Sequence, residues 1–178
     1  PATFCSAAAT FPEMALRLLP LLFLLAATLA RAGDDLPATA PLFAANLWDT
    51  DDKPVALERY RGKPLIVNFW ARWCGPCRQE IPELIKVRAA HKGKLEVLGI
   101  GIEDKAESVQ EFAKAYDMDY PVLLAKDKGI PLMQALGNPK AGLPFTVVID
   151  RNGQMVSKRL GVMKKADLDA AAEALLKK

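Results

Sequence analysis

The stretch that decides the fold is FWARWCGPCRQEIPEL, residues 69–84, which carries Cys74 and Cys77 with two residues between them. The run that leads into it, PLIVNFW at 64–70, is nearly continuously apolar and typical of a strand buried on both faces. A cysteine pair at such a place can be a structural staple, half of a metal site or a reaction centre. The rest of the sequence separates these three possibilities.

The composition describes one globular domain. The chain has 178 residues, of which 51% are hydrophobic, enough for a substantial core. Lys and Arg number 24 against 21 Asp and Glu, so the net charge is +3, and the basic residues form no cluster. This pattern gives no reason to expect a nucleic-acid partner.

Residues 14–32, MALRLLPLLFLLAATLARA, have the layout of a secretory signal peptide. Arg17 precedes an apolar run at 18–30, and the segment ends in the small-x-small cleavage pattern Ala-Arg-Ala at 30–32. The run is shorter than the about 20 residues that span a bilayer, so we expect cleavage. The protein is therefore predicted to be periplasmic, with an uncleaved N-terminal membrane anchor as the alternative.

We expect four segments along the chain. Residues 1–13 are an upstream extension outside the fold, 14–32 the signal peptide, 33–41 a polar linker and 42–178 a single domain. Because Cys5 leaves with the leader, the exported chain keeps one cysteine pair. An exported domain stapled by disulfides normally has several pairs, which argues against a purely structural role.

Short apolar runs and helical periods alternate along this domain. The strand candidates are a hairpin at 42–57 with an acidic turn, then 64–70, 95–102, the weaker 121–124, and a second hairpin of 145–150 with 155–160 around Asn152-Gly153. Helices are expected directly after the first cysteine, at 109–116 and at 168–176. The alternation predicts an α/β fold, a sheet with helices on both faces.

The residues favour a redox role for the cysteine pair. A structural zinc site needs four ligands, and the two cysteines with the lone His91, at an expected helix end, do not supply them. A disulfide that closes so short a loop constrains the unfolded chain little. At a strand–helix junction, however, the sulfur of Cys74 meets the helix N-terminus, which stabilises a thiolate. Cys77, one turn on, can then attack a mixed disulfide.

The chain resembles the thioredoxin family. The run Trp73–Cys77 matches the WCGPC signature, Pro82 matches the proline inside the active-site helix, and 142–146 resembles the cis-proline loop. The signal peptide, the first hairpin and the phrase NFWA at 68–71 resemble the TlpA/ResA-type extracytoplasmic reductases. The resemblance covers roughly 42–176 and implies a thioredoxin fold, a central mixed β-sheet flanked by helices on both faces, with an N-terminal β-hairpin.

The resemblance also implies roles for individual residues. Cys74 is expected to attack the substrate disulfide, Cys77 to resolve the mixed disulfide, and Pro144 to shape the substrate groove. Glu80 matches a glutamate that ResA-like proteins place near the active site, and a solvated helix residue is the equally supported alternative. Asn68 stands where cytosolic thioredoxin has a buried aspartate. The substrate-binding residues implied are Trp73, Gly75, Pro76 and Leu143, with no metal and no cofactor.

These expectations describe an exported thiol-disulfide oxidoreductase. The resemblance implies a reductase of disulfides in periplasmic proteins, for example apocytochrome c during cytochrome c maturation or copper-site proteins. A monomer is expected, with disulfide-bearing proteins as substrates and a membrane-bound electron donor that reduces the Cys74–Cys77 pair again. The alternatives are a net oxidant or isomerase of the same fold, and a binding module in which the cysteines are dispensable.

Overall fold

The computed structural model describes residue 3 and residues 36–103 and 105–177. The predicted extension apart from residue 3, the predicted signal peptide and the first residues of the predicted linker lie outside this part of the chain. Within the described part, no helix has the length and apolar character needed to cross a membrane.

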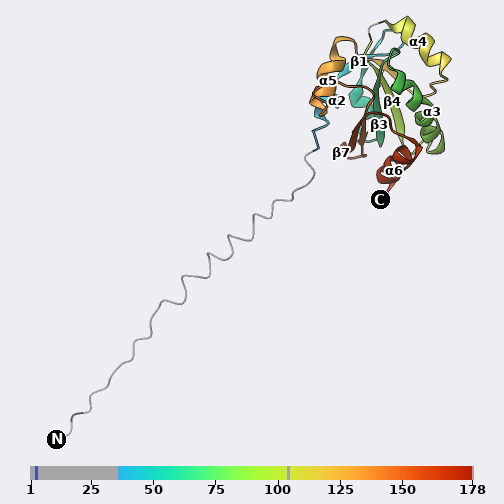
Figure 1. Cartoon of the computed structure of the whole chain (residues 1–178). Helices are drawn as coiled ribbons and strands as arrows, with labels where there is room; N and C mark the ends of the chain where they lie inside the picture. Colours follow the sequence, from blue (N-terminus) through green and yellow to red (C-terminus); the bar gives the residue numbers. More distant parts are fainter. Residues whose placement is uncertain (1–2, 4–35, 104, 178) are drawn as a thin grey trace. The chain divides into compact units, whose positions relative to one another are not determined.

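The described domain is built on a mixed sheet of seven strands in the order β2-β1-β5-β4-β3-β6-β7 (Figure 1). The central strands β3, β4 and β5 are parallel to one another, whereas β6, β7, β1 and β2 pair antiparallel with their neighbours. The strands are β1 Asn46–Trp48, β2 Pro54–Ala56, β3 Leu65–Trp70, β4 Glu96–Gly101, β5 Val122–Leu124, β6 Phe145–Ile149 and β7 Met155–Leu160. The predicted α/β class with a mixed sheet is confirmed.

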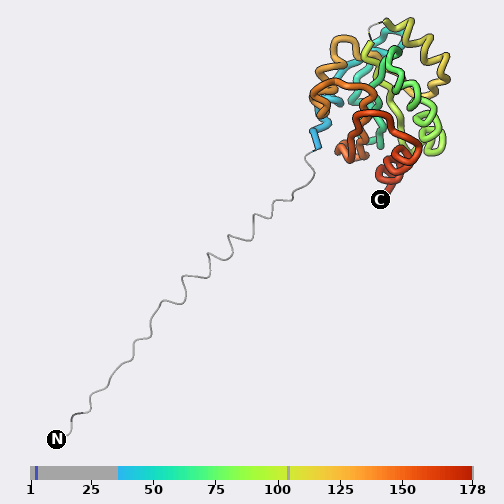
Figure 2. Tube along the Cα trace, viewed as in Figure 1, coloured from blue at the N-terminus to red at the C-terminus, as the bar shows by residue number. Residues whose placement is uncertain are grey.

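Helices cover both faces of the sheet (Figures 1 and 2). They are α2 Ala40–Ala44, α3 Gly75–Ala90, α4 Ala106–Ala115, α5 Gly129–Ala135 and α6 Lys165–Leu176, with 3-10 turns at Leu57–Tyr60 and Lys126–Lys128. Helices α3 and α6 pack together over Ile66 and Val148. Helices α2 and α5 cover the opposite face over Val67 and Phe69. Strand β3 therefore has a helical layer on each side.

Strand β3 is the centre of this arrangement, as its apolar sequence predicts. All six residues are buried, between β4 on one side and β6 on the other. Alternate side chains point to opposite faces of a strand, so Ile66, Asn68 and Trp70 share the face that α3 covers. The strand delivers the chain directly to Cys74 at the start of α3.

The N-terminal part of the domain differs from the prediction. The hairpin is present but short, with Asn46 opposite Ala56 and Trp48 opposite Pro54. Residues 42–44 belong to helix α2 rather than to a strand. Proline is well suited to a first helical turn, and Pro41 occupies that place, while the next two side chains are buried in the core. Because Leu36 also packs against this core, the folded domain begins before residue 42.

Helix α5 was not predicted from the sequence. It begins at Gly129 and contains Pro131, two residues that normally indicate a turn. Its side chains Leu132 and Met133, with Leu136 just beyond, are nevertheless buried against the sheet. Elsewhere the expected elements are confirmed, including the weak strand candidate, which is β5, and the turn before β7, where Gly153 has a φ of +78°.

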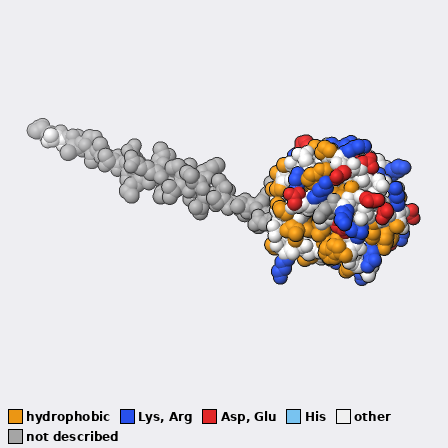
Figure 3. Space-filling view, turned by 90° about the horizontal axis from the view of Figure 1, so that it is seen from above, with side chains coloured by type: hydrophobic (Ala, Val, Ile, Leu, Met, Phe, Trp, Pro, Cys, Tyr) orange, Lys and Arg blue, Asp and Glu red, His pale blue; other side chains and the backbone are white. Residues whose placement is uncertain are grey.

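The surface carries both signs of charge. On the face shown in Figure 3, Lys and Arg side chains lie interspersed with Asp, Glu and hydrophobic side chains. Strands β2 and β7 form the two edges of the sheet.

Two glycines in β4 provide a matched test of core packing. A Cβ atom at Gly99 would lie 2.9 Å from Tyr120 Cε2 and 3.1 Å from Trp70 Nε1, whereas at Gly101 the nearest atoms are 3.7 Å away. We expect Gly99→Ala to lower the free energy of unfolding by about 1–3 kcal/mol, because the rigid rings must move. Gly101→Ala should leave stability unchanged or raise it by up to about 1 kcal/mol. Urea unfolding of the oxidised proteins measures both, and equal losses would contradict the packing described here.

Candidate active site

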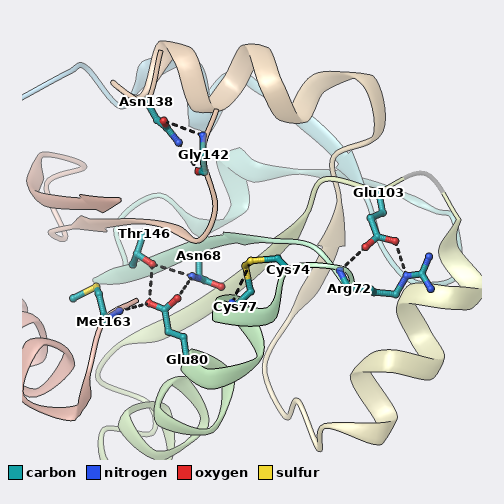
Figure 4. The surroundings of a disulfide bond; sticks show 10 residues. All are labelled: Asn68, Arg72, Cys74, Cys77, Glu80, Glu103, Asn138, Gly142, Thr146 and Met163. Atoms are coloured by element: carbon teal, nitrogen blue, oxygen red, sulfur yellow. Dashed lines mark hydrogen bonds and ion pairs between the residues drawn. A yellow bond between two sulfur atoms is a disulfide. The ribbon is translucent and has the colours of Figure 1, made fainter. Parts of the chain in front are cut away.

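The two cysteines lie where β3 passes into α3, and they form a disulfide with an S–S distance of 2.04 Å (Figure 4). Cys74 is the N-cap residue of the helix, and its Sγ accepts a hydrogen bond of 3.2 Å from the backbone N–H of Cys77. The N-terminal end of a helix carries a partial positive charge, which favours a thiolate at this position. Cys74 is 5% exposed and Cys77 is 1% exposed, so Cys74 is the more exposed of two largely buried residues.

The residues expected to bind substrate surround the disulfide on its outer side. Trp73 is 71% exposed, the most exposed of the large hydrophobic side chains in the described domain. Gly75 is half-buried and Pro76 is exposed at the first turn of α3. Leu143 packs against the buried cluster that contains both cysteines. The structure therefore brings the predicted contact residues to one place.

The predicted proline loop also reaches this site. The peptide bond between Leu143 and Pro144 is cis, and Pro144 is buried directly before β6. Its carbonyl accepts a hydrogen bond of 2.8 Å from the N–H of Gly161, which ties the loop to the end of β7.

Behind the disulfide, Glu80 lies fully buried in a polar network (Figure 4). Its carboxylate accepts hydrogen bonds from Asn68 Nδ2 at 3.0 Å, from the backbone N–H of Met163 at 3.2 Å and from Thr146 Oγ1 at 3.3 Å. Asn68 Nδ2 also donates to Thr146 Oγ1 at 2.9 Å. The alternative that Glu80 is a solvated helix residue is therefore wrong, because its side chain is 0% exposed.

Burial raises the pKa of Glu80 to about 7, even though the hydrogen bonds from Met163, Thr146 and Asn68 act in the opposite direction. Desolvation disfavours the charged carboxylate more than these three donors stabilise it. A carboxyl group that titrates near neutral pH can both accept and release a proton under physiological conditions. This group sits one helical turn from Cys77.

Sequence reasoning missed the part that Thr146 plays in this network. It lies in an apolar strand, FTVVI, and the signal for it was a lone polar residue in a run expected to be buried. The register of the sheet places it directly opposite Asn68, so their side chains share one face. A pairing of β3 with β6, which the sequence does not specify, was needed to connect them.

Trp70 and Arg72, which both lie close to Cys74 in the sequence, have distinct surroundings. Trp70 is buried and stacks on Phe112 with ring centroids 5.0 Å apart, so it belongs to the core. Arg72 donates from its backbone N–H and from Nε to the two carboxylate oxygens of Glu103, at 2.5 Å each. This pair joins the loop before Cys74 to the segment that follows β4.

Comparison with known proteins agrees with this geometry. The Redoxin family model matches residues 31–175. The chain is 32% identical over 132 residues to the thiol-disulfide oxidoreductase ResA of Bacillus cereus, which covers 73% of this chain and 72% of the relative. It is 31% identical over 140 residues to ResA of Geobacillus kaustophilus, covering 78% and 76%.

Solved structures show the same fold. A thiol:disulfide interchange protein of the thioredoxin family from Chlorobium tepidum superposes with a TM-score of 0.68 at 29% identity, covering 80% of this chain and 97% of that one. The DsbF protein of Mycobacterium tuberculosis superposes with a TM-score of 0.66 at 24% identity, covering 76% and 97%. The chain therefore belongs to the Redoxin family, and within it to the thiol-disulfide oxidoreductases with a thioredoxin fold.

Proposed function

We propose that this protein is an exported reductase of protein disulfides that works through the Cys74–Cys77 pair. The observation that carries the proposal is the position of this pair, at the N-terminus of α3 with the buried Glu80 carboxylate behind it. The N-terminus of α3 favours a thiolate at Cys74, and the Glu80 carboxylate can take up a proton. A dithiol reductant needs both.

In the first step, the Cys74 thiolate of the reduced enzyme attacks one sulfur of the substrate disulfide. A bond forms between Cys74 Sγ and that sulfur, the substrate S–S bond breaks, and the other substrate sulfur leaves as a thiolate that takes a proton from solvent. Cys74 is the proposed nucleophile because it caps the helix and is the more exposed of the two cysteines.

In the second step, Cys77 releases its proton and attacks Cys74 Sγ, which forms the enzyme disulfide and expels the second substrate thiolate. Two electrons have then passed from the enzyme to the substrate. We assign the proton of Cys77 to Glu80, because this carboxyl group is buried one turn away and its pKa is about 7. Asn68, which replaces the aspartate expected in cytosolic thioredoxin, would orient the carboxylate rather than accept the proton.

Substrate contact is assigned to the surface around the disulfide. Trp73 offers a large exposed apolar side chain beside Cys74, a feature typical of interaction sites. We propose that Gly75 and Pro76 leave the approach to the sulfur open and that Leu143 and Pro144 form the opposite wall of a substrate groove. This assignment rests on the placement of the five residues and on the family resemblance.

The cellular role follows from export. In an oxidising compartment, a reductase must be reduced again after each turnover, which implies a membrane-bound electron donor. The signal-peptide pattern at 14–32 supports a periplasmic location, and the Gly-Pro dipeptide between the cysteines supports a reducing potential. Apocytochrome c and copper-site proteins are the substrate classes that the ResA resemblance suggests, and we propose a monomer as the active form.

The direction of electron flow can be measured directly. We expect the Cys74–Cys77 couple to have a reduction potential near the about −270 mV of thioredoxin, far from the about −120 mV of a strong periplasmic oxidant. Equilibration with dithiothreitol buffers, followed by alkylation and mass measurement, gives the potential. A value close to the oxidant would replace the reductase with a net oxidant of the same fold.

The division of labour between the two sulfurs is also testable. Cys77→Ser should accumulate mixed disulfides with substrate proteins, because attack at Cys74 still occurs and resolution does not. Cys74→Ser should trap none, since Cys77 is the less accessible thiol. Non-reducing electrophoresis after expression in the exported compartment reports both variants. Equal trapping by the two variants would count against the assignment, and capture of partners by the double variant would favour a binding module.

The role of Glu80 predicts a pH effect. Glu80→Gln cannot accept the proton of Cys77, so substrate reduction should slow by on the order of a hundredfold, the usual contribution of a general base. The inflection near pH 7 should disappear from its rate profile, because that inflection belongs to the carboxyl group. Stopped-flow reduction across pH compares the two proteins, and superimposable profiles would remove the carboxylate from the mechanism.

Equilibrium stability of the same variant provides the control. The pKa of Glu80 rises on folding from 4.5 to about 7, so the folded protein binds the proton more tightly than the unfolded chain. Between these pH values the wild type should lose stability as the pH rises, by on the order of 3 kcal/mol in total. Glu80→Gln should lack this slope. A difference in stability between the wild type and Glu80→Gln that does not change over this range would show that Glu80 is ionised at an ordinary pH.

A further inference from the structure

The loop between α5 and β6 is held by one buried side chain, Asn138 (Figure 4). The residue is 3% exposed and follows the end of α5, where its backbone N–H donates to the carbonyl of Met133 at 3.0 Å. Met133 is itself fully buried in the core. Asn138 is therefore anchored to a rigid part of the domain.

The amide group of Asn138 binds both backbone groups of one residue, Gly142. Asn138 Nδ2 donates to the Gly142 carbonyl at 2.8 Å, and the Gly142 N–H donates to Asn138 Oδ1 at 3.2 Å. The turn between them is closed by the N–H of Ala141, which donates to the Asn138 carbonyl at 3.0 Å. A pair of opposed hydrogen bonds fixes the peptide groups in orientation as well as in position.

Leu160, at the end of β7, contacts the same glycine. A Cβ atom at Gly142 would lie only 3.0 Å from Leu160 Cδ1, closer than an ordinary van der Waals contact. The backbone of Gly142 thus sits between an amide clamp and a leucine side chain. The next residue, Leu143, packs against the cluster that contains Cys74 and Cys77.

We propose that Asn138 is a positioning residue, which sets Leu143 and Pro144 beside the disulfide so that a polypeptide substrate is held for attack. This inference rests on the proposed substrate-binding role of Leu143 and Pro144. Because Gly142 directly precedes them, any displacement of its backbone passes to the groove wall. A misplacement of about 1 Å in a substrate-positioning element can cost on the order of a hundredfold in rate.

The role predicts a difference between large and small disulfides. A protein substrate needs the groove wall in place, whereas a small disulfide needs only access to Cys74. Asn138 forms no hydrogen bond with either cysteine in the described structure, and the network around Glu80 does not include it. Loss of the clamp should therefore spare the sulfur chemistry.

The test uses two variants of Asn138. Asn138→Ala removes both side-chain hydrogen bonds to Gly142. Asn138→Asp keeps the acceptor for the Gly142 N–H but replaces the Nδ2 donor by an oxygen that faces the Gly142 carbonyl. Gln134→Ala is the matched control, because Gln134 Nε2 donates to the Pro139 carbonyl at 3.3 Å in the same segment without touching Gly142. Each full-length protein is assayed for reduction of insulin and of bis(2-hydroxyethyl) disulfide. Circular dichroism verifies that the variants are folded.

We expect both Asn138 variants to reduce insulin at least about tenfold more slowly, and the small disulfide within about twofold of the wild type. The control should match the wild type on both substrates. If Asn138→Ala does not fold, Asn138→Asp carries the test, because it retains one of the two hydrogen bonds to Gly142 and should also slow insulin selectively.

Two results would overturn the inference and leave the proposed function standing. One is an unchanged insulin rate in a folded Asn138 variant, and the other is an equal loss on both substrates. A wild type that reduces the small disulfide but neither insulin nor a disulfide-bonded apocytochrome c would instead refute the proposed reduction of protein disulfides, and the positioning role with it.

Discussion

The structure depends on one buried carboxylate and the donors that surround it. Glu80 comes from α3, Asn68 from β3, Thr146 from β6, and the backbone N–H of Met163 from the segment before α6. An isolated carboxylate would be costly in this interior, and these donors reduce that cost only if all four elements keep their places. The network thus joins the redox centre to the central sheet and to the C-terminal helix.

The same network explains a balance between stability and chemistry. If the donors offset the full cost of burial, the pKa of Glu80 would remain near its usual value and the group would be a poor proton acceptor at neutral pH. Burial instead exceeds what they provide, so the pKa lies near 7 and the folded state is less stable when Glu80 is charged. A buried charge whose desolvation is not fully offset is typical of groups that take part in a reaction.

The sequence predicted the elements whose local signals agree with their surroundings. The apolar run of β3 and the cysteine spacing at the start of α3 led directly to the central strand and the site. Helix α5 was missed because Gly129 and Pro131 indicate a turn locally, and burial of Leu132 and Met133 overrides that signal. The clamp of Asn138 on Gly142 could not be predicted, because it depends on a loop conformation that no pattern in 138–142 encodes. The pairing of β3 with β6 was likewise invisible to local reasoning, whereas the hairpin pairings of β1 with β2 and of β6 with β7 were predicted.

The two edges of the sheet affect how a protein with other proteins as substrates can bind their extended segments. Unpaired strand edges can recruit any extended polypeptide and seed aggregation. Here β2 begins with Pro54, which lacks a backbone N–H, and β7 carries the exposed Lys158 and Arg159. Proline and positive charge both discourage the addition of a foreign strand. The sheet edges therefore do not favour the docking of unfolded segments, and the exposed Trp73 beside the sulfur atoms is the contact site that we propose for the substrate.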